Sequence, residues 1–104
     1  MMLNLPDQIL EIIKSYAFFK PKTTDEIRTA VDIWYYDKIN ALNYFGHIST
    51  WDVSLIKNFS RLFMNKRFFN DNISNWKISK KSNIKYMFIG TWSLSYINLP
   101  NLKY

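Results

Sequence analysis

The sequence predicts an α/β fold, in which a helical N-terminal cap precedes a short leucine-rich-repeat-like solenoid of two full units and a partial third. Two observations support this prediction. Apolar residues recur at helical spacing in the first 46 residues, and a 25-residue pattern then occurs twice. A period of that length lies in the size range of repeats that build solenoids. The predicted cap spans 1–46 and the repeat region 47–104, with units at 48–72 and 73–97 and a partial unit at 98–104.

The first predicted helix covers residues 6–18. Pro6 suits the first helical turn, where its missing N–H is not needed. The residue before Pro21 resists helical geometry, so the helix ends ahead of it. One face carries an apolar stripe at helical spacing, made of Leu5, Ile9, Ile12, Ile13 and Tyr16.

A second helix is predicted over residues 24–45. Thr23 and Glu26 have the spacing of a capping box, and Gly46 is a natural C-terminal stop. Lys38 interrupts the apolar stripe, whose members are Ile27, Val31, Trp34, Leu42 and Phe45.

The internal repeat is the strongest pattern in the chain. The segment ISTWDVS at 48–54 aligns with ISNWKIS at 73–79, and the same offset pairs Asn58 with Asn83 and Leu62 with Met87. The residues that define the repeat core are Ile48, Trp51, Val53, Phe63, Ile73, Trp76, Ile78 and Phe88.

Each unit is interpreted as a strand, a cap and a short helix. Trp51 and Val53 alternate with Asp52, as in a half-buried strand. Ser54 and Ser79 are suitable N-caps for helices near 55–64 and 80–88. A third strand is expected at 97–99, where Pro100 limits it to an edge position.

Stacking of the two units predicts three neighbouring pairs. Strands in register lie about 4.8 Å apart, so the offset places Trp51 near Trp76 and Val53 near Ile78. It also places Asp52 beside Lys77, where opposite charges attract.

These residues resemble the BspA-like repeat family, domain of unknown function 285, whose units read I-x-x-W-D-V-S followed by an apolar pattern that ends in M-F. The two units match it at 51–54 with 62–63 and at 76–79 with 87–88, and the lead-in from 30 to 48 is similar as well. Lys77 stands where the family pattern has aspartate. The resemblance implies a right-handed leucine-rich-type solenoid used for binding, without catalytic residues. It also implies an origin in a large DNA virus, which the residues favoured by AT-rich codons would suit.

The N-terminus resembles the opening of an F-box, which docks adaptor proteins onto ubiquitin ligases. Trp34 lies near the position of an F-box tryptophan. The partner-binding residues implied by this resemblance are Leu5, Pro6, Ile9, Ile12 and Ile13. The alternative is a helix that only closes the end of the repeats, since a repeat array exposes its terminal apolar face.

Composition excludes most enzyme classes. The chain has no cysteine, one histidine (His47) and two glycines. Disulfides, thiolate and multi-histidine metal sites and a glycine-rich phosphate loop are therefore excluded. We expect no catalytic residues, no metal and no cofactor. No apolar run is long enough for a membrane span and the N-terminus lacks a basic leader, so an intracellular location is expected.

Charge is concentrated in the second half of the chain. Residues 53–104 hold nine lysines and arginines and one aspartate, a net charge of +8. The basic surface is assigned to Lys77, Lys80, Lys81 and Lys85. Interleaved with Trp76 and Tyr86, these lysines could bind nucleic acid; the favoured interpretation is that Trp76 is core and only the lysines are outside.

The sequence favours a noncatalytic protein–protein interaction module. The alternatives are a structural or capsid-associated component of a large DNA virus, an F-box-like ubiquitin-ligase adaptor, and a basic nucleic-acid-binding protein. The expected partners are proteins, including capsid proteins or a second copy, that meet the C-terminal strand edge.

Overall fold

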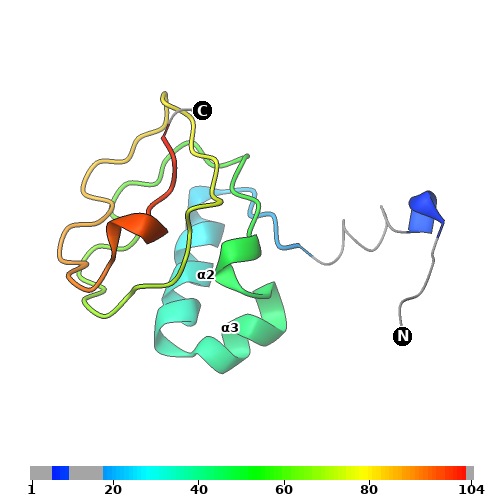
Figure 1. Cartoon of the computed structure of the whole chain (residues 1–104), viewed down its shortest axis with the longest axis horizontal. Helices are drawn as coiled ribbons and strands as arrows, with labels where there is room; N and C mark the ends of the chain where they lie inside the picture. The colour runs from blue at the N-terminus through cyan, green and yellow to red at the C-terminus, as the bar shows by residue number, and fades with distance from the viewer. Residues whose placement is uncertain (1–5, 10–17, 103–104) are drawn as a thin grey trace.

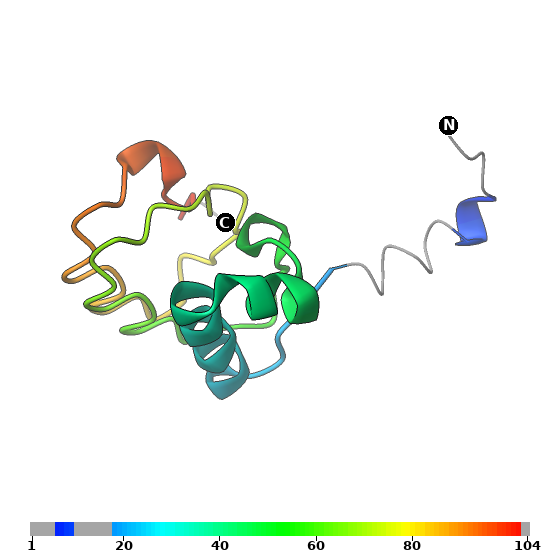
Figure 2. The same cartoon turned by 90° about the horizontal axis from the view of Figure 1, so that it is seen from below.

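The computed structural model describes residues 6–9 and 18–102 (Figure 1). The regular elements between 18 and 102 are α2 (Thr24–Tyr36), α3 (Lys38–Phe45) and two 3-10 turns, η1 (Ile48–Thr50) and η2 (Tyr96–Asn98). Asp7–Ile9 are helical, in agreement with the first predicted helix, whose remaining turns lie outside the described residues. Helices α2 and α3 pack on one side of the repeat region, which continues as turns (Figures 1 and 2).

The predicted α/β leucine-rich-repeat-like solenoid is wrong. Residues 18–102 form no strand, and backbone pairing of the strand type is limited to isolated bridges, Asn58 with Asn83 and Lys77 with Asn101. The short helices expected at 55–64 and 80–88 are also replaced by turns. The strand expected at 97–99 is replaced by η2 and the bend that follows it. Residues 24–102 form a helical hairpin, made of α2 and α3, joined to repeats built from turns.

The single helix predicted over 24–45 is two helices, because Asp37 breaks it. Asp37 has φ −147° and ψ 70°, and its N–H closes α2 on the carbonyl of Ile33. Its carboxylate then accepts the backbone N–H of Asn40 at 3.4 Å and the Asn40 amide at 2.6 Å. An aspartate that caps the next helix in this way lets α3 start in a new direction.

The predicted cap of α2 is confirmed at Thr23. The Thr23 hydroxyl accepts the N–H of Glu26 at 3.1 Å. The Glu26 carboxylate accepts the N–H of Lys22 at 3.3 Å rather than that of Thr23. Side-chain oxygens thus accept one free N–H group in the first turn of α2 and the N–H of Lys22 just before the helix.

The 25-residue sequence repeat is a repeat of backbone conformation. The side-chain oxygen of Asn58 accepts the N–H of Ser60, and that of Asn83 accepts the N–H of Lys85, at 2.9 and 3.0 Å. Left-handed φ values recur at the same offset, in the pairs Arg61 (58°) and Tyr86 (59°), and Asn65 (63°) and Gly90 (76°). Backbone hydrogen bonds between residues three apart recur as well: the N–H of Leu62 donates to the carbonyl of Phe59, and the N–H of Met87 donates to that of Ile84. We call residues 48–72 unit 1 and residues 73–97 unit 2.

The two units run side by side (green and orange in Figures 1 and 2). Alternate N–H groups of unit 1 donate to alternate carbonyls of unit 2. These bonds join Phe59 to Asn83, Arg61 to Lys85, Phe63 to Met87 and Asn65 to Ile89, with distances of 2.7 to 3.0 Å. Each residue of unit 1 in this stretch therefore lies beside its equivalent in unit 2.

One hydrophobic core joins α2 to both units. Trp51 and Trp76 stack with ring centroids 6.2 Å apart and an interplanar angle of 22°, as predicted. Trp34 of α2 meets the edge of Trp51 at 6.1 Å, and Phe63 stacks on Phe88 at 5.6 Å. The helices and the repeats are therefore parts of one packed body.

Candidate functional site

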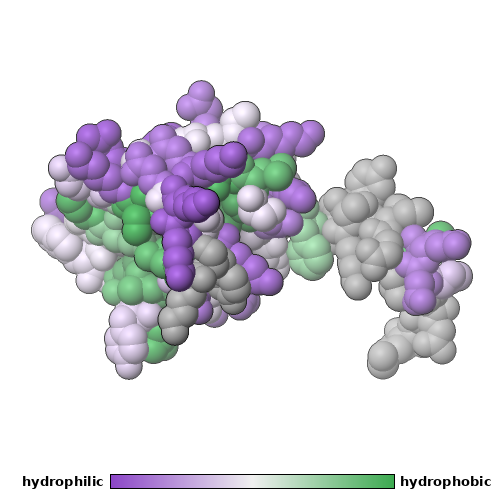
Figure 3. Space-filling model, turned by 90° about the horizontal axis from the view of Figure 1, so that it is seen from above, coloured by the Kyte–Doolittle hydropathy of each residue, from purple (hydrophilic) through white to green (hydrophobic). Residues whose placement is uncertain are grey.

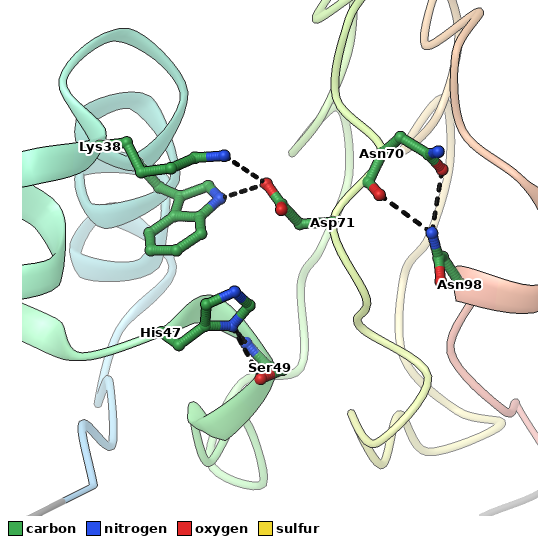
Figure 4. Close-up of polar contacts among 7 residues, drawn as sticks. Lys38, His47, Ser49, Asn70, Asp71 and Asn98 are labelled. Atoms are coloured by element: carbon green, nitrogen blue, oxygen red, sulfur yellow. Dashed lines mark hydrogen bonds and ion pairs between the residues drawn. The ribbon is translucent and has the colours of Figure 1, made fainter.

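Polar contacts close unit 1 on the side of α2. Asp71 accepts the indole N–H of Trp34 at 2.9 Å and the Lys38 ammonium at 3.0 Å (Figure 4). The nearly buried ammonium of Lys66 contacts the carboxylate of Asp32 at 2.8 Å. These groups satisfy one another, although the same side has a hollow of about 420 Å³ whose lining includes the exposed side chains of Tyr36 and Phe68.

One side of unit 1 is covered by unit 2. The equivalent side of unit 2 is not covered by any described residue. Phe59 is completely buried, whereas its equivalent Ile84 is 39% exposed. Beyond it, Ile89 is 51% exposed and Trp92 is 74% exposed. We call the backbone and side chains of residues 84–90 the open edge.

The open edge also carries backbone donors. Unit 2 has the backbone conformation of unit 1, so alternate N–H groups point away from unit 1. No acceptor for them exists among residues 6–9 and 18–102. These groups belong to Ile84, Tyr86, Phe88 and Gly90. In unit 1, the equivalent N–H groups donate hydrogen bonds to the carbonyls of unit 2.

Basic side chains flank the open edge. Lys85 and Arg61 approach the ring of Tyr86, with the Lys85 ammonium 5.1 Å and the Arg61 guanidinium 5.4 Å from its centroid. Arg67 lies 4.8 Å from the ring centroid of Trp92. On the face drawn in Figure 3, hydrophilic side chains likewise interrupt patches of apolar surface.

The structure exposes the four lysines assigned to the basic surface, Lys77, Lys80, Lys81 and Lys85. Lys77 and Lys81 line a shallow hollow of about 350 Å³ between the units, together with Lys57 and Ser82. Trp76 is buried, which confirms the interpretation that it belongs to the core.

The residues assigned to the repeat core lie inside the protein. Seven are buried, and Phe88, which belongs to the open edge, is partly buried. The buried seven are Ile48, Trp51, Val53, Phe63, Ile73, Trp76 and Ile78.

Asp52 and Lys77 both line a second hollow, of about 290 Å³, in line with the predicted register. Asp52 forms an ion pair with Lys20 at 3.8 Å. Hydrogen bonding from Ser54, with a smaller contribution from Lys20, lowers the pKa of the Asp52 carboxyl below its ordinary value, against the opposing effect of partial burial.

The N-terminal residues implied by the F-box resemblance fall mostly outside the described chain. Pro6 and Ile9 are exposed. Leu5, Ile12 and Ile13 lie outside the described residues.

His47 has a local structural role. Its Nδ1 accepts the N–H of Ser49 at 3.1 Å (Figure 4), and its ring meets that of Trp34 at 4.9 Å. Within the described ranges, no group of three or more metal-ligating side chains occurs. No described helix is long and apolar enough to cross a membrane.

Sequence reasoning missed the open edge. The alignment of the two units contained part of the information, because Ile84 is the apolar equivalent of Phe59 and a neighbouring segment is needed to cover it. Ile89 and Trp92 occupy the positions of Met64 and Arg67. The row of N–H donors could not be found, since it depends on the left-handed turns.

The helical hairpin, the two turn-built units and their shared core define a small repeat protein whose unit 1 is covered by helices and by unit 2. The chain belongs to the family described as "Mycoplasma protein of unknown function, DUF285", whose model matches residues 19–101. That match confirms the BspA-like resemblance of the repeats and covers α2, α3 and both units. No curated protein and no solved structure matches the chain.

Proposed function

We propose that this protein is a noncatalytic protein–protein interaction module that binds its partner at the open edge. The observation that supports the proposal is the contrast between equivalent positions. The side chain of Phe59 is fully buried, whereas its equivalent Ile84 is 39% exposed, and Ile89 and Trp92 expose further apolar surface beside it. Exposed apolar side chains rimmed by charged ones are typical of interaction surfaces.

The two sides of the repeat region differ in how the apolar residues of the repeats are covered. Helix α2 satisfies unit 1 with its apolar stripe and with the contacts of Asp71 and Lys66. Covering the open edge would remove apolar surface from water, at roughly 25 cal/mol per Å². A partner at this edge would gain that free energy without disturbing the helices.

Site-specific photo-crosslinking tests the proposal. A photoreactive phenylalanine analogue is placed at Trp92 beside the open edge, or at Tyr36, which is 76% exposed on α2. The protein is irradiated in cells that produce it and the adducts are identified by mass spectrometry. We expect a defined protein adduct at position 92 that is absent at position 36.

A second variant links the adduct to the edge. Ile89→Glu places a charge in the apolar part of the open edge, so it should abolish the adduct at position 92 while the fold is kept. Adducts that are the same at positions 36 and 92, or that survive Ile89→Glu, would contradict the proposed function.

A further inference from the structure

We infer that the open edge binds an acidic peptide segment of a partner protein, whose main-chain carbonyl oxygens pair with the row of N–H groups at 84–90. This inference rests on the proposed function and names the chemistry of the partner. It follows from the backbone donors, the charge around them and the way in which unit 1 already binds unit 2.

The backbone of the open edge requires acceptors rather than donors. The carbonyls of Ile84, Tyr86 and Phe88 already accept N–H groups three residues further on, at 3.1 to 3.5 Å. The N–H groups of these three residues and of Gly90 have no acceptor within the described chain. A ligand that covers the edge must supply an oxygen for about every second residue, or it leaves buried donors unsatisfied.

The contact between the units shows which ligand satisfies this requirement. The equivalent N–H groups of unit 1 donate to the carbonyls of another segment of the chain, unit 2, at 2.7 to 3.0 Å. That segment also covers the apolar side chain of Phe59. A peptide offers both alternate carbonyls and apolar side chains for Ile84 and Ile89, whereas a nucleic acid backbone offers oxygens only.

Charge selects an acidic peptide. Lys80, Lys81 and Lys85 are exposed on unit 2, and Arg61 joins Lys85 over the ring of the edge residue Tyr86. The single acidic residue after Asp52, Asp71, is held by Lys38 and Trp34 on the other side of the repeats. Complementary charge steers the partner and penalises basic segments.

The test uses the full chain and two synthetic peptides, with blocked ends, that copy residues 82–91. One peptide carries Ser82→Glu, Lys85→Glu and Thr91→Glu, and the other carries lysine at the same three positions. Both keep the carbonyl pattern and the apolar residues of the segment that unit 1 binds. They differ only in charge.

Amide hydrogen exchange followed by NMR reports on the pairing. In the free protein, the unit 1 donors that are bonded to unit 2 should exchange slowly and the four donors of the open edge should exchange rapidly. The acidic peptide should slow the four open-edge amides by about tenfold or more. The lysine peptide should leave them unchanged.

A matched pair of protein variants tests the charge requirement. Lys85→Glu and Lys22→Glu change the net charge equally, but only Lys85 lies at the open edge. Lys85→Glu should weaken binding of the acidic peptide by about tenfold, and Lys22→Glu should have a much smaller effect. Lys80→Glu combined with Lys81→Glu provides a second variant should Lys85→Glu perturb the fold.

Two results would overturn the inference. Binding of the acidic peptide without slower exchange at the open edge would mean that lysines alone hold it. Slower exchange caused by oligothymidylate but not by the acidic peptide would assign the edge to nucleic acid. The crosslinking at position 92 is read separately, so a protein partner found there together with a failed peptide test would leave the proposed function intact.

Discussion

At Gly90 the backbone of unit 2 lies close to Asn65 of unit 1. It has a left-handed φ of 76°, and a Cβ built on it would lie 2.4 Å from the side-chain oxygen of Asn65 and 3.1 Å from its Cα. Gly90→Ala therefore adds a steric conflict to an unfavourable φ. We expect it to lower the free energy of unfolding by about 1–3 kcal/mol, measured by urea denaturation.

The contribution of the Asn65 side chain can be separated by a second substitution. Asn65→Gly removes the oxygen that lies nearest to the added Cβ, and glycine tolerates the φ of 63° found there. Gly90→Ala should therefore cost less in the Asn65→Gly background than in the natural sequence. Equal costs in the two backgrounds would show that the φ of residue 90 and the backbone of residue 65, and not the Asn65 side chain, are responsible.

Asp52 gives unit 1 a pH-dependent contact that unit 2 lacks, since Lys77 stands at the equivalent position. Hydrogen bonds from Ser54 and the charge of Lys20 hold the pKa of Asp52 below 3.8 in the folded protein. A carboxyl with a lowered pKa stabilises the fold at neutral pH, and this stabilisation disappears as the pH falls through about 4 and below.

Asp52→Asn measures that contribution. At pH 7 the variant should be less stable by well under about 1 kcal/mol, because the carboxylate is substantially exposed. The difference from the natural sequence should shrink when the same urea denaturation is repeated at pH 3. A difference that is equal at both pH values would rule out the carboxylate as its source.

At the scale of the elements, the sequence predicted the repeat and misassigned its backbone. The pairing of Trp51 with Trp76 followed from the offset, because identical units must present identical residues to each other. The three-residue alternation around Asp52 is too short to distinguish a strand from an extended link between turns. The left-handed residue Arg61 gives no sequence signal, since such φ values are normally expected at glycine or asparagine.

The break between α2 and α3 was visible only in part. Lys38 interrupts the apolar stripe, which indicated a change of face but not the end of a helix. Asp37 ends α2 because its carboxylate accepts a hydrogen bond from a free N–H group in the first turn of α3, which stabilises the start of that helix. The open edge could not be predicted for a related reason. Its N–H donors point in the same direction only because left-handed residues such as Tyr86 and Gly90 orient the backbone.

Asp71 is one of several polar connections between the helical hairpin and unit 1, together with the Lys66–Asp32 ion pair and the bond from Arg28 to Ser60. It accepts the N–H of Trp34, which is buried, and it pairs with the ammonium of Lys38. Asp71→Ala leaves the indole donor without its acceptor, so we expect a loss of about 1–3 kcal/mol in the free energy of unfolding. Thermal denaturation followed by circular dichroism would measure it.

Asp71→Asn separates the hydrogen bond from the charge. The amide oxygen can still accept the indole N–H, while the attraction to Lys38 is lost. The exposed ion pair is worth about 0–1 kcal/mol, so this variant should be clearly more stable than Asp71→Ala. If the two variants were equally unstable, the charge of Asp71 and not its contact with Trp34 would hold the hairpin in place.

At the scale of the whole molecule, the hairpin and the repeats depend on one another. Neither α2 nor a turn-built unit has a separate core, because Trp34, Trp51 and Trp76 form one connected row of rings. An isolated helix as short as α2 is marginal in water without such packing. The chain should therefore unfold in one step, with the helices and the units losing structure together.

Ile78→Val tests this dependence from a core residue of unit 2. Ile78 is completely buried in unit 2, and removal of one methylene group from such a site costs about 0.5–1.5 kcal/mol. In a one-step transition, far-ultraviolet circular dichroism, which reports on α2 and α3, and tryptophan fluorescence should shift to the same lower urea midpoint. The matched variant Ile39→Val, at a position of α3 that is 75% exposed, should leave both midpoints almost unchanged. Helical signal that persists after the fluorescence transition of Ile78→Val would show that the hairpin is stable without unit 2, which a single shared core does not allow.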